Sequence, residues 1–312
     1  MFGLGFALSF GYWTTNFAEV QRALSAKDLS AARRTPLIGA FPKVFIPFLT
    51  IIPGLLAVAL VPGFRSAGAD YNNAIPALMR DLLPSGVLGI GITGLLAAFM
   101  AGMAANISGF NTVFTYDLWR PYVARDRDDR HYLMVGRVAT VVGILIGIGT
   151  AFIAAGFSNI MNYIQTLFSY FNAPLFAVFI LALFWKRVSP WAGFYGLISG
   201  IVAAFVAHYV LPHFGYFHAG QSVGGKVNDQ MVNFYGAITA VIVSWIVMTG
   251  VTAVTRPKPV EELAGLVWGE PDPAAEQLRQ VQRRRRPRWW ESPAVLGTGA
   301  LGLTAVLSLM FL

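Results

Sequence analysis

The stretch that begins at Gly11, GYWTTNFAEVQRALSAKDLSAARRTPL, has the residue types and spacing that most clearly suggest chemistry. An aromatic pair, Tyr12 and Trp13, is followed by a polar run that ends at Asn16 and then by a basic segment. Aromatic rings and an amide can together hold a small polar solute. Because transporters bind their solutes at short polar breaks between apolar helix segments, the stretch predicts a binding site inside a membrane.

The whole chain has the composition of an integral membrane protein. Of its 312 residues, 56% are hydrophobic and only 12% are charged, more apolar surface than a soluble core of this size could hide. Continuous, glycine-rich apolar runs predict helices rather than the alternating strands of a β-barrel. Eight runs are long enough to span a bilayer: 1–20, 37–62, 86–116, 134–157, 160–184, 190–211, 232–254 and 293–312.

The distribution of basic residues predicts the orientation of these spans. Of the 23 lysines and arginines, 18 lie in alternate connections and three in the opposite ones. The positive-inside rule makes the richer set cytoplasmic. The net charge of +8 and the cluster at 283–288 therefore indicate a membrane surface, and no nucleic-acid partner is expected.

Several chemistries lack the residues they require. The chain has no cysteine, and we find no phosphate-binding glycine loop, no Ser/His/Asp set and no pair of catalytic carboxylates, so no catalytic residue and no enzyme activity is predicted. His208, His213 and His218 recur every five residues, a spacing that does not share a helix face, so no metal site is predicted either.

Ionisable groups inside the spans are the usual sign of proton relays, and no aspartate or glutamate lies there. A coupling ion would have to be held by hydroxyls, amides and backbone carbonyls, which suit an alkali cation. This pattern favours sodium over protons.

The third span carries two features of interest. Rows of small residues that include Gly94, Ala98 and Gly102 would let another helix approach closely. Its polar end, with Asn106, Asn111 and nearby hydroxyls, would either solvate a pathway or form hydrogen bonds across helices.

In combination, several motifs resemble the sodium:solute symporter family, which includes proline, sialic acid and glucose cotransporters. They are YW followed by N, QR and LSAKD after Gly11, the Pro53–Gly54 pair, LLPSGVLGI from Leu82, FNTVFTYD, YIQ and PLFAVFILALFWKR. The resemblance extends from Gly11 to about Leu211 and more weakly beyond.

The resemblance implies an all-α fold in which two inverted five-helix repeats enclose the substrate between the broken first and sixth core helices. This chain would supply the second repeat at 1–184 (core helices six to ten), peripheral helices at 185–254, a basic cytoplasmic linker at 255–292 and a C-terminal transmembrane helix at 293–312. The first repeat, needed for a complete site, is expected to lie outside the chain.

The resemblance also implies site residues. Tyr12, Trp13, Asn16 and Gln165 match substrate-site positions, although the aromatic rings could simply pack, Asn16 could cap a broken helix and Gln165 could bond across helices. The family's sodium site uses a backbone carbonyl, matched by Ala98, and two hydroxyl residues, replaced here by Ala101 and Gly102. Two sodium ligands are thus missing.

We therefore expect a multi-pass protein of the cell membrane, inner or plasma, that carries a small organic solute by alternating access. Sodium is the expected coupling ion, and no other cofactor is expected. The alternative is a transporter-like sensor or scaffold domain that does not transport.

Overall fold

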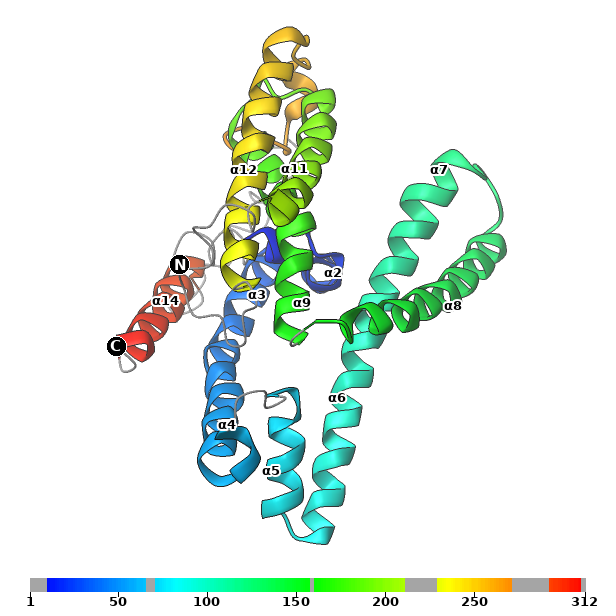
Figure 1. The fold of residues 1–312 in the computed structure, drawn as a ribbon. Helices are drawn as coiled ribbons and strands as arrows, with labels where there is room; N and C mark the ends of the chain where they lie inside the picture. Colours follow the sequence, from blue (N-terminus) through cyan, green and yellow to red (C-terminus); the bar gives the residue numbers. More distant parts are fainter. Residues whose placement is uncertain (1–9, 66–70, 158–159, 211–228, 271–291, 310–312) are drawn as a thin grey trace. The chain divides into compact units, whose positions relative to one another are not determined.

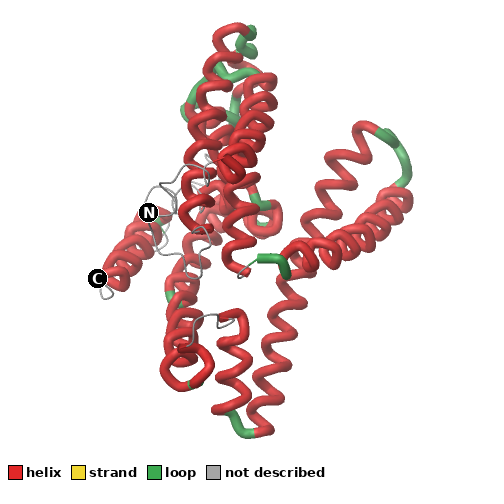
Figure 2. The backbone as a smooth tube through the Cα atoms, viewed as in Figure 1, coloured by secondary structure: helices red, strands yellow, loops and turns green. Residues whose placement is uncertain are grey.

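The computed structural model describes residues 10–65, 71–157, 160–210, 229–270 and 292–309. Figure 2 shows that helices account for most of these ranges and that no strand occurs within them. The expected all-α architecture is therefore confirmed.

Six helical segments in the described part of the chain are long and apolar enough to cross a membrane. The first expected span lies largely outside the described residues, and the last corresponds to a shorter apolar helix. The six segments are Ser30–Leu60, Ser85–Tyr122, Asp129–Ala154, Ile160–Phe184, Pro190–Val210 and Met231–Val254. They confirm a multi-pass membrane protein, while the count of eight spans stays a prediction.

The described residues form two compact units, which alternate along the sequence. The first comprises residues up to Asn16 and 161–290; the second comprises 17–160 and the C-terminal segment. Besides helical residues 10–15, the first unit contains α9 (Ile160–Leu167), η4 (Phe168–Asn172), α10 (Ala173–Phe184), α11 (Pro190–Val210), α12 (Asp229–Val254) and η8 (Val260–Leu263). The second contains α2 (Phe17–Leu24), α3 (Leu29–Val44), α4 (Ile46–Leu60), η1 (Pro62–Arg65), η2 (Tyr71–Asn73), α5 (Ala74–Leu82), α6 (Ser85–Thr112), η3 (Val113–Trp119), α7 (Arg120–Tyr122), α8 (Asp129–Ala154) and α14 (Pro293–Leu309).

Prolines set the break in the second expected span. α3 ends at Val44 and α4 begins at Ile46, with Pro42 in the last turn of the first helix and Pro47 in the first turn of the second. Proline lacks an N–H and clashes with the preceding turn, so a continuous helix cannot pass through this segment undisturbed. The helix is accordingly interrupted at Phe45.

Small residues hold the first unit together. Figure 1 shows α11 beside α12, and α11 buries Ala192, Gly196, Gly200 and Ala204, one every four residues. A Cβ atom on Gly200 would lie 2.8 Å from Pro174 Cβ and would collide with Ser244 Oγ. The backbones of these helices therefore approach closely only because this row carries almost no side-chain volume.

The segment after α12 folds back onto α10. The backbone N–H of Trp268 donates to the carbonyl of Leu183 at 2.8 Å, and Leu263 and Val267 are buried. An ion pair between Lys186 and Glu270 adds a polar contact. The N-terminal part of the expected linker thus packs against the end of α10.

In the second unit, α6 packs on α8 through its polar end. Asn111 Nδ2 donates to Thr140 Oγ1 at 3.2 Å, and Thr115 Oγ1 donates to Asn111 Oδ1 at 3.2 Å. Of the two readings of this polar end, bonding across helices is what the structure shows for Asn111. The small-residue row behaves differently, because a Cβ on Gly94 or Gly102 would meet nothing within 4 Å among the described residues.

We expect Gly200→Ala to lower the melting temperature of the purified protein in detergent. Alanine is the better helix former by about 1 kcal/mol, but overpacking a filled interface costs about 1 to 3 kcal/mol. Gly193→Ala on the same helix is the control, because its Cβ would lie 3.7 Å from Val178 Cγ1, an ordinary contact. Equal shifts for the two variants would contradict the close packing of α11 on α12.

Candidate functional site

The helix that carries Tyr12 is interrupted at Asn16. Residues 10–15 are helical, Asn16 is not, and α2 begins at Phe17. The hydroxyls of Thr14 and Thr15 donate to the carbonyls of Phe10 and Gly11 at 2.7 and 2.6 Å. Such back-bonding satisfies hydroxyls locally and bends helices, so the polar run ends this helix without leaving its threonines unpaired.

Residues 10–12 of this helix pack on one face of η4 and α10. The ring of Tyr12 lies 6.0 Å from that of Phe168, and the ring of Phe10 lies 5.9 Å from that of Phe176. Between these contacts, a Cβ on Gly11 would lie only 3.0 Å from Asn172 Oδ1. From residue 12 back to residue 10, the partners advance from residue 168 to residue 176. The N-terminal helix therefore runs antiparallel to η4 and α10.

Gln165 continues this face by one turn. It precedes Phe168 by three residues, and residues three apart on a helix are neighbours on its surface. Gln165 and Phe168 are therefore neighbouring positions on the surface of this helical segment. Its Oε1 atom is buried and has no hydrogen-bond partner among the described residues.

A buried acceptor without a donor costs about 1 to 3 kcal/mol. A bound solute that donates a hydroxyl or amine hydrogen to Gln165 Oε1 would recover that free energy. Both readings of Gln165, a substrate contact and a bond across helices, stay predictions, and among the described residues its Oε1 atom accepts no such bond.

The structure places the other two expected residues in the same short segment. Trp13 and Asn16 follow Tyr12 and are half-buried. All four expected substrate residues thus belong to the first unit. Their direct role in binding stays a prediction.

A π-helical turn separates Gln165 from α10. In η4 the N–H of Ala173 donates to the carbonyl of Phe168, five residues back. Pro174 has no N–H, so it cannot donate to the carbonyl four residues earlier as an α-helix would require. A π-helical turn pairs the neighbouring groups with a wider spacing instead. Single π-helical turns often occur at functional sites, and this one lies immediately after Gln165.

A buried polar network anchors α9 on α12. Thr166 Oγ1 donates at 2.8 Å to the carbonyl of Asn162 and lies 3.0 Å from Asn233 Oδ1, while Asn233 Nδ2 lies 3.5 Å from that carbonyl. Both Thr166 and Asn233 are almost wholly buried. Sequence analysis missed Asn233, although a lone asparagine in the apolar run of α12 was the available signal.

The expected ion position lies on α6, in the second unit. Ala98, Ala101 and Gly102 are exposed there, and the carbonyl of Gly102 accepts a hydrogen bond from Asn106 Nδ2 at 2.9 Å. None of these three residues has a side-chain oxygen. In the described part of the chain, no group of three or more histidines, aspartates or glutamates could hold a metal ion.

Comparison with known proteins gives a consistent result. Residues 1–200 match the model of the sodium:solute symporter family. The chain is 30% identical over 300 residues to sodium/glucose cotransporter 4 of Homo sapiens, covering 90% of this chain and 44% of that protein. The corresponding protein of Danio rerio is 29% identical over 286 residues, which is 86% of this chain and 43% of that protein.

A bacterial relative shows the same relation. The sodium/glucose cotransporter of Vibrio parahaemolyticus is 31% identical over 203 residues, covering 61% of this chain and 37% of that protein. The chain thus spans less than half the length of the curated relatives it matches.

We expect Thr166→Val to destabilise the protein more than Thr239→Val does. Both threonines bond the carbonyl four residues back, but only Thr166 also bonds another helix. Valine keeps the shape but leaves the buried Asn233 side chain without this partner, which costs about 1 to 3 kcal/mol. Thermal unfolding in detergent measures it, and equal melting temperatures would show that the Asn233 contact contributes nothing.

Proposed function

Because the chain belongs to the sodium:solute symporter family, we propose that it forms the C-terminal part of a sodium-coupled secondary transporter for a small organic solute. The proposed mechanism is alternating access, in which a site near mid-membrane opens to one side at a time. The observation that carries the proposal is the buried Gln165 Oε1, which has no hydrogen-bond partner among the described residues and lies three positions before Phe168, the residue whose ring meets that of Tyr12.

The proposed solute is polyhydroxylated. The relatives include proteins named as glucose, mannose and myo-inositol cotransporters. Each of these solutes presents several hydroxyl donors, and Gln165 Oε1 needs one. The ring of Tyr12 would cover the apolar face of such a solute, with Trp13 and Asn16 completing the same side of the site.

The proposed domain organisation follows the family. Residues 1–184 would form the second inverted repeat, 185–254 the peripheral helices, 255–292 a cytoplasmic linker and 293–312 a final transmembrane helix. The first repeat would be supplied by sequence outside this chain. A site between two repeats requires both, so the complete protein is the unit that transports.

The proposed ion site departs from the family pattern. Ala98 keeps the backbone carbonyl that would serve as one ligand, but Ala101 and Gly102 have no side-chain hydroxyl. Sodium exchanges its hydration shell for protein oxygens, so the loss of two oxygens should weaken binding. Coupling through this position is therefore expected to be weaker than in a protein that keeps the hydroxyl pair.

We expect Gln165→Leu in the complete protein to raise the KM for glucose or myo-inositol about tenfold, since one lost hydrogen bond is worth about 1 to 2 kcal/mol. Radiolabelled uptake into proteoliposomes measures this change. Met161→Leu is the control, because Met161 lies one turn earlier on the same helix and is exposed. An unchanged KM in Gln165→Leu would remove Gln165 from the proposed site.

We also expect the double change Ala101→Ser and Gly102→Ser to lower the sodium concentration needed for half-maximal uptake, because it adds two oxygen ligands. Serine adds little volume, and a Cβ on Gly102 meets nothing within 4 Å among the described residues. Ala97→Ser with Gly94→Ser is the control on the same helix. Tight sodium activation already present in the unmodified protein would show that a different set of ligands holds the ion.

A further inference from the structure

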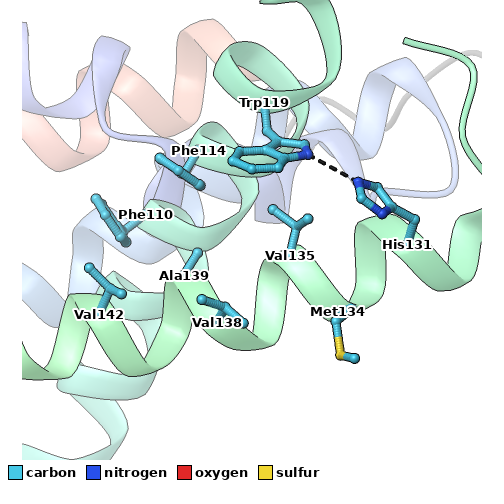
Figure 3. Close-up of a pocket in the computed structure, with 9 residues that line it drawn as sticks. All are labelled: Phe110, Phe114, Trp119, His131, Met134, Val135, Val138, Ala139 and Val142. Atoms are coloured by element: carbon cyan, nitrogen blue, oxygen red, sulfur yellow. Dashed lines mark hydrogen bonds between the residues drawn. The ribbon is translucent and has the colours of Figure 1, made fainter. Parts of the chain in front are cut away.

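An apolar groove lies between α6 with η3 on one side and α8 on the other, entirely within the second unit. Its volume is about 250 Å³. Figure 3 shows aromatic rings from α6 and η3 opposite short aliphatic side chains from α8. The lining residues are Phe110, Phe114, Trp119, His131, Met134, Val135, Val138, Ala139 and Val142.

A π-helical turn builds the aromatic wall. Phe110 and Phe114 are four residues apart and their rings stack at 6.1 Å. In an uninterrupted α-helix, Leu118 would continue this row. In η3, however, the N–H of Arg120 donates to the carbonyl of Thr115, five residues back. The added residue brings Trp119 into the row instead, with its ring 6.2 Å from that of Phe114.

The groove has one polar end. There Trp119 Nε1 donates to His131 Nε2 at 3.1 Å, drawn as the dashed line in Figure 3. An arginine adjoins each partner in the sequence, Arg120 after the tryptophan and Arg130 before the histidine, and both are exposed. The guanidinium of Arg120 lies 5.4 Å from the centre of the Tyr132 ring, next to His131.

This polar end has the chemistry of a membrane interface. Tryptophan and arginine gather where lipid headgroups meet the hydrocarbon, and the arginine-rich connection between α6 and α8 is one of those that the charge distribution makes cytoplasmic. The remaining lining is hydrocarbon or aromatic. The groove therefore runs from headgroup level into the apolar core.

Its length matches one leaflet. From His131 to Val142 the wall of α8 rises through eleven residues, about 16 Å at 1.5 Å per residue, and half of a hydrocarbon core of about 30 Å is about 15 Å. Met134 and Val138 are largely exposed, so the groove is open along its side to an occupant. An extended acyl chain fits these dimensions better than a second helix, whose diameter is about 10 Å or more.

We propose that this groove binds one phospholipid, with an acyl chain against Phe110, Phe114 and Val138 and the phosphate near Arg120 and Arg130. Aspartates in the same connection, Asp126, Asp128 and Asp129, offset much of its positive charge. Recognition therefore depends on the chain and the phosphate rather than on a net anionic headgroup. The lining does not include Tyr12 or Gln165, and the proposal does not depend on the proposed transport activity.

The test uses the complete protein, reconstituted in phosphatidylcholine, extracted in detergent and examined by native mass spectrometry. Val138→Trp fills the groove, whereas Val141→Trp places the same ring at an exposed position of α8 outside it. We expect one retained phospholipid per protein in the unmodified form and in Val141→Trp, and at least a tenfold lower occupancy in Val138→Trp.

A second filling variant, Val142→Trp, provides an independent measurement at the inner end of the groove if Val138→Trp does not fold. We expect the same loss of lipid there. Equal retention in the filled and control variants would overturn the proposal. Absence of retained lipid from the unmodified protein would also overturn the proposal, because the groove would then hold no phospholipid.

Discussion

The structure depends on the requirement that backbone hydrogen bonds inside a bilayer be satisfied within the polypeptide. Hydrocarbon offers no donor or acceptor, so each unpaired backbone group costs several kcal/mol. The long helices of this chain meet the requirement throughout most of their length. The places where they depart from α-helical geometry are therefore informative, because each departure must be compensated nearby.

Two of these departures share a cause. η3 and η4 each end two residues before a proline, Pro121 and Pro174, which cannot donate to the preceding turn. A π-helical turn widens the helix and re-pairs the neighbouring groups instead of breaking the helix. In the first unit this turn follows Gln165, and in the second it brings Trp119 onto the wall of the groove. Both candidate sites thus lie beside a proline-adapted turn.

Much of the architecture follows directly from the sequence. Continuous apolar runs require helices, Pro42 and Pro47 flank the break between α3 and α4, and the polar run before Asn16 ends the first helix. These are local effects of side chains on their own backbone. The family resemblance adds the matched positions Tyr12 and Gln165, which the structure places on facing segments of one unit.

Other features depend on which helices meet, and local sequence does not specify that. A row of small residues on α6 and a similar row on α11 look equivalent as patterns, yet in the described structure only the row on α11 packs closely against another helix. The role of Asn233 is likewise not predictable from its own sequence neighbourhood, because it depends on the hydrogen bond with Thr166 of α9. The return of residues 260–270 onto α10 requires contacts that are distant in sequence.

Gln165 and Thr166 are adjacent residues whose side chains have different surroundings. Thr166 is bonded both to its own helix and to Asn233, so it fixes α9 in place. Gln165, one residue earlier, has a buried acceptor, Oε1, without a hydrogen-bond partner among the described residues. In the proposed site, a solute hydroxyl that met this acceptor would gain a hydrogen bond without first displacing another one. Because the anchored neighbour limits the motion of the backbone, little conformational entropy should be lost when the bond forms.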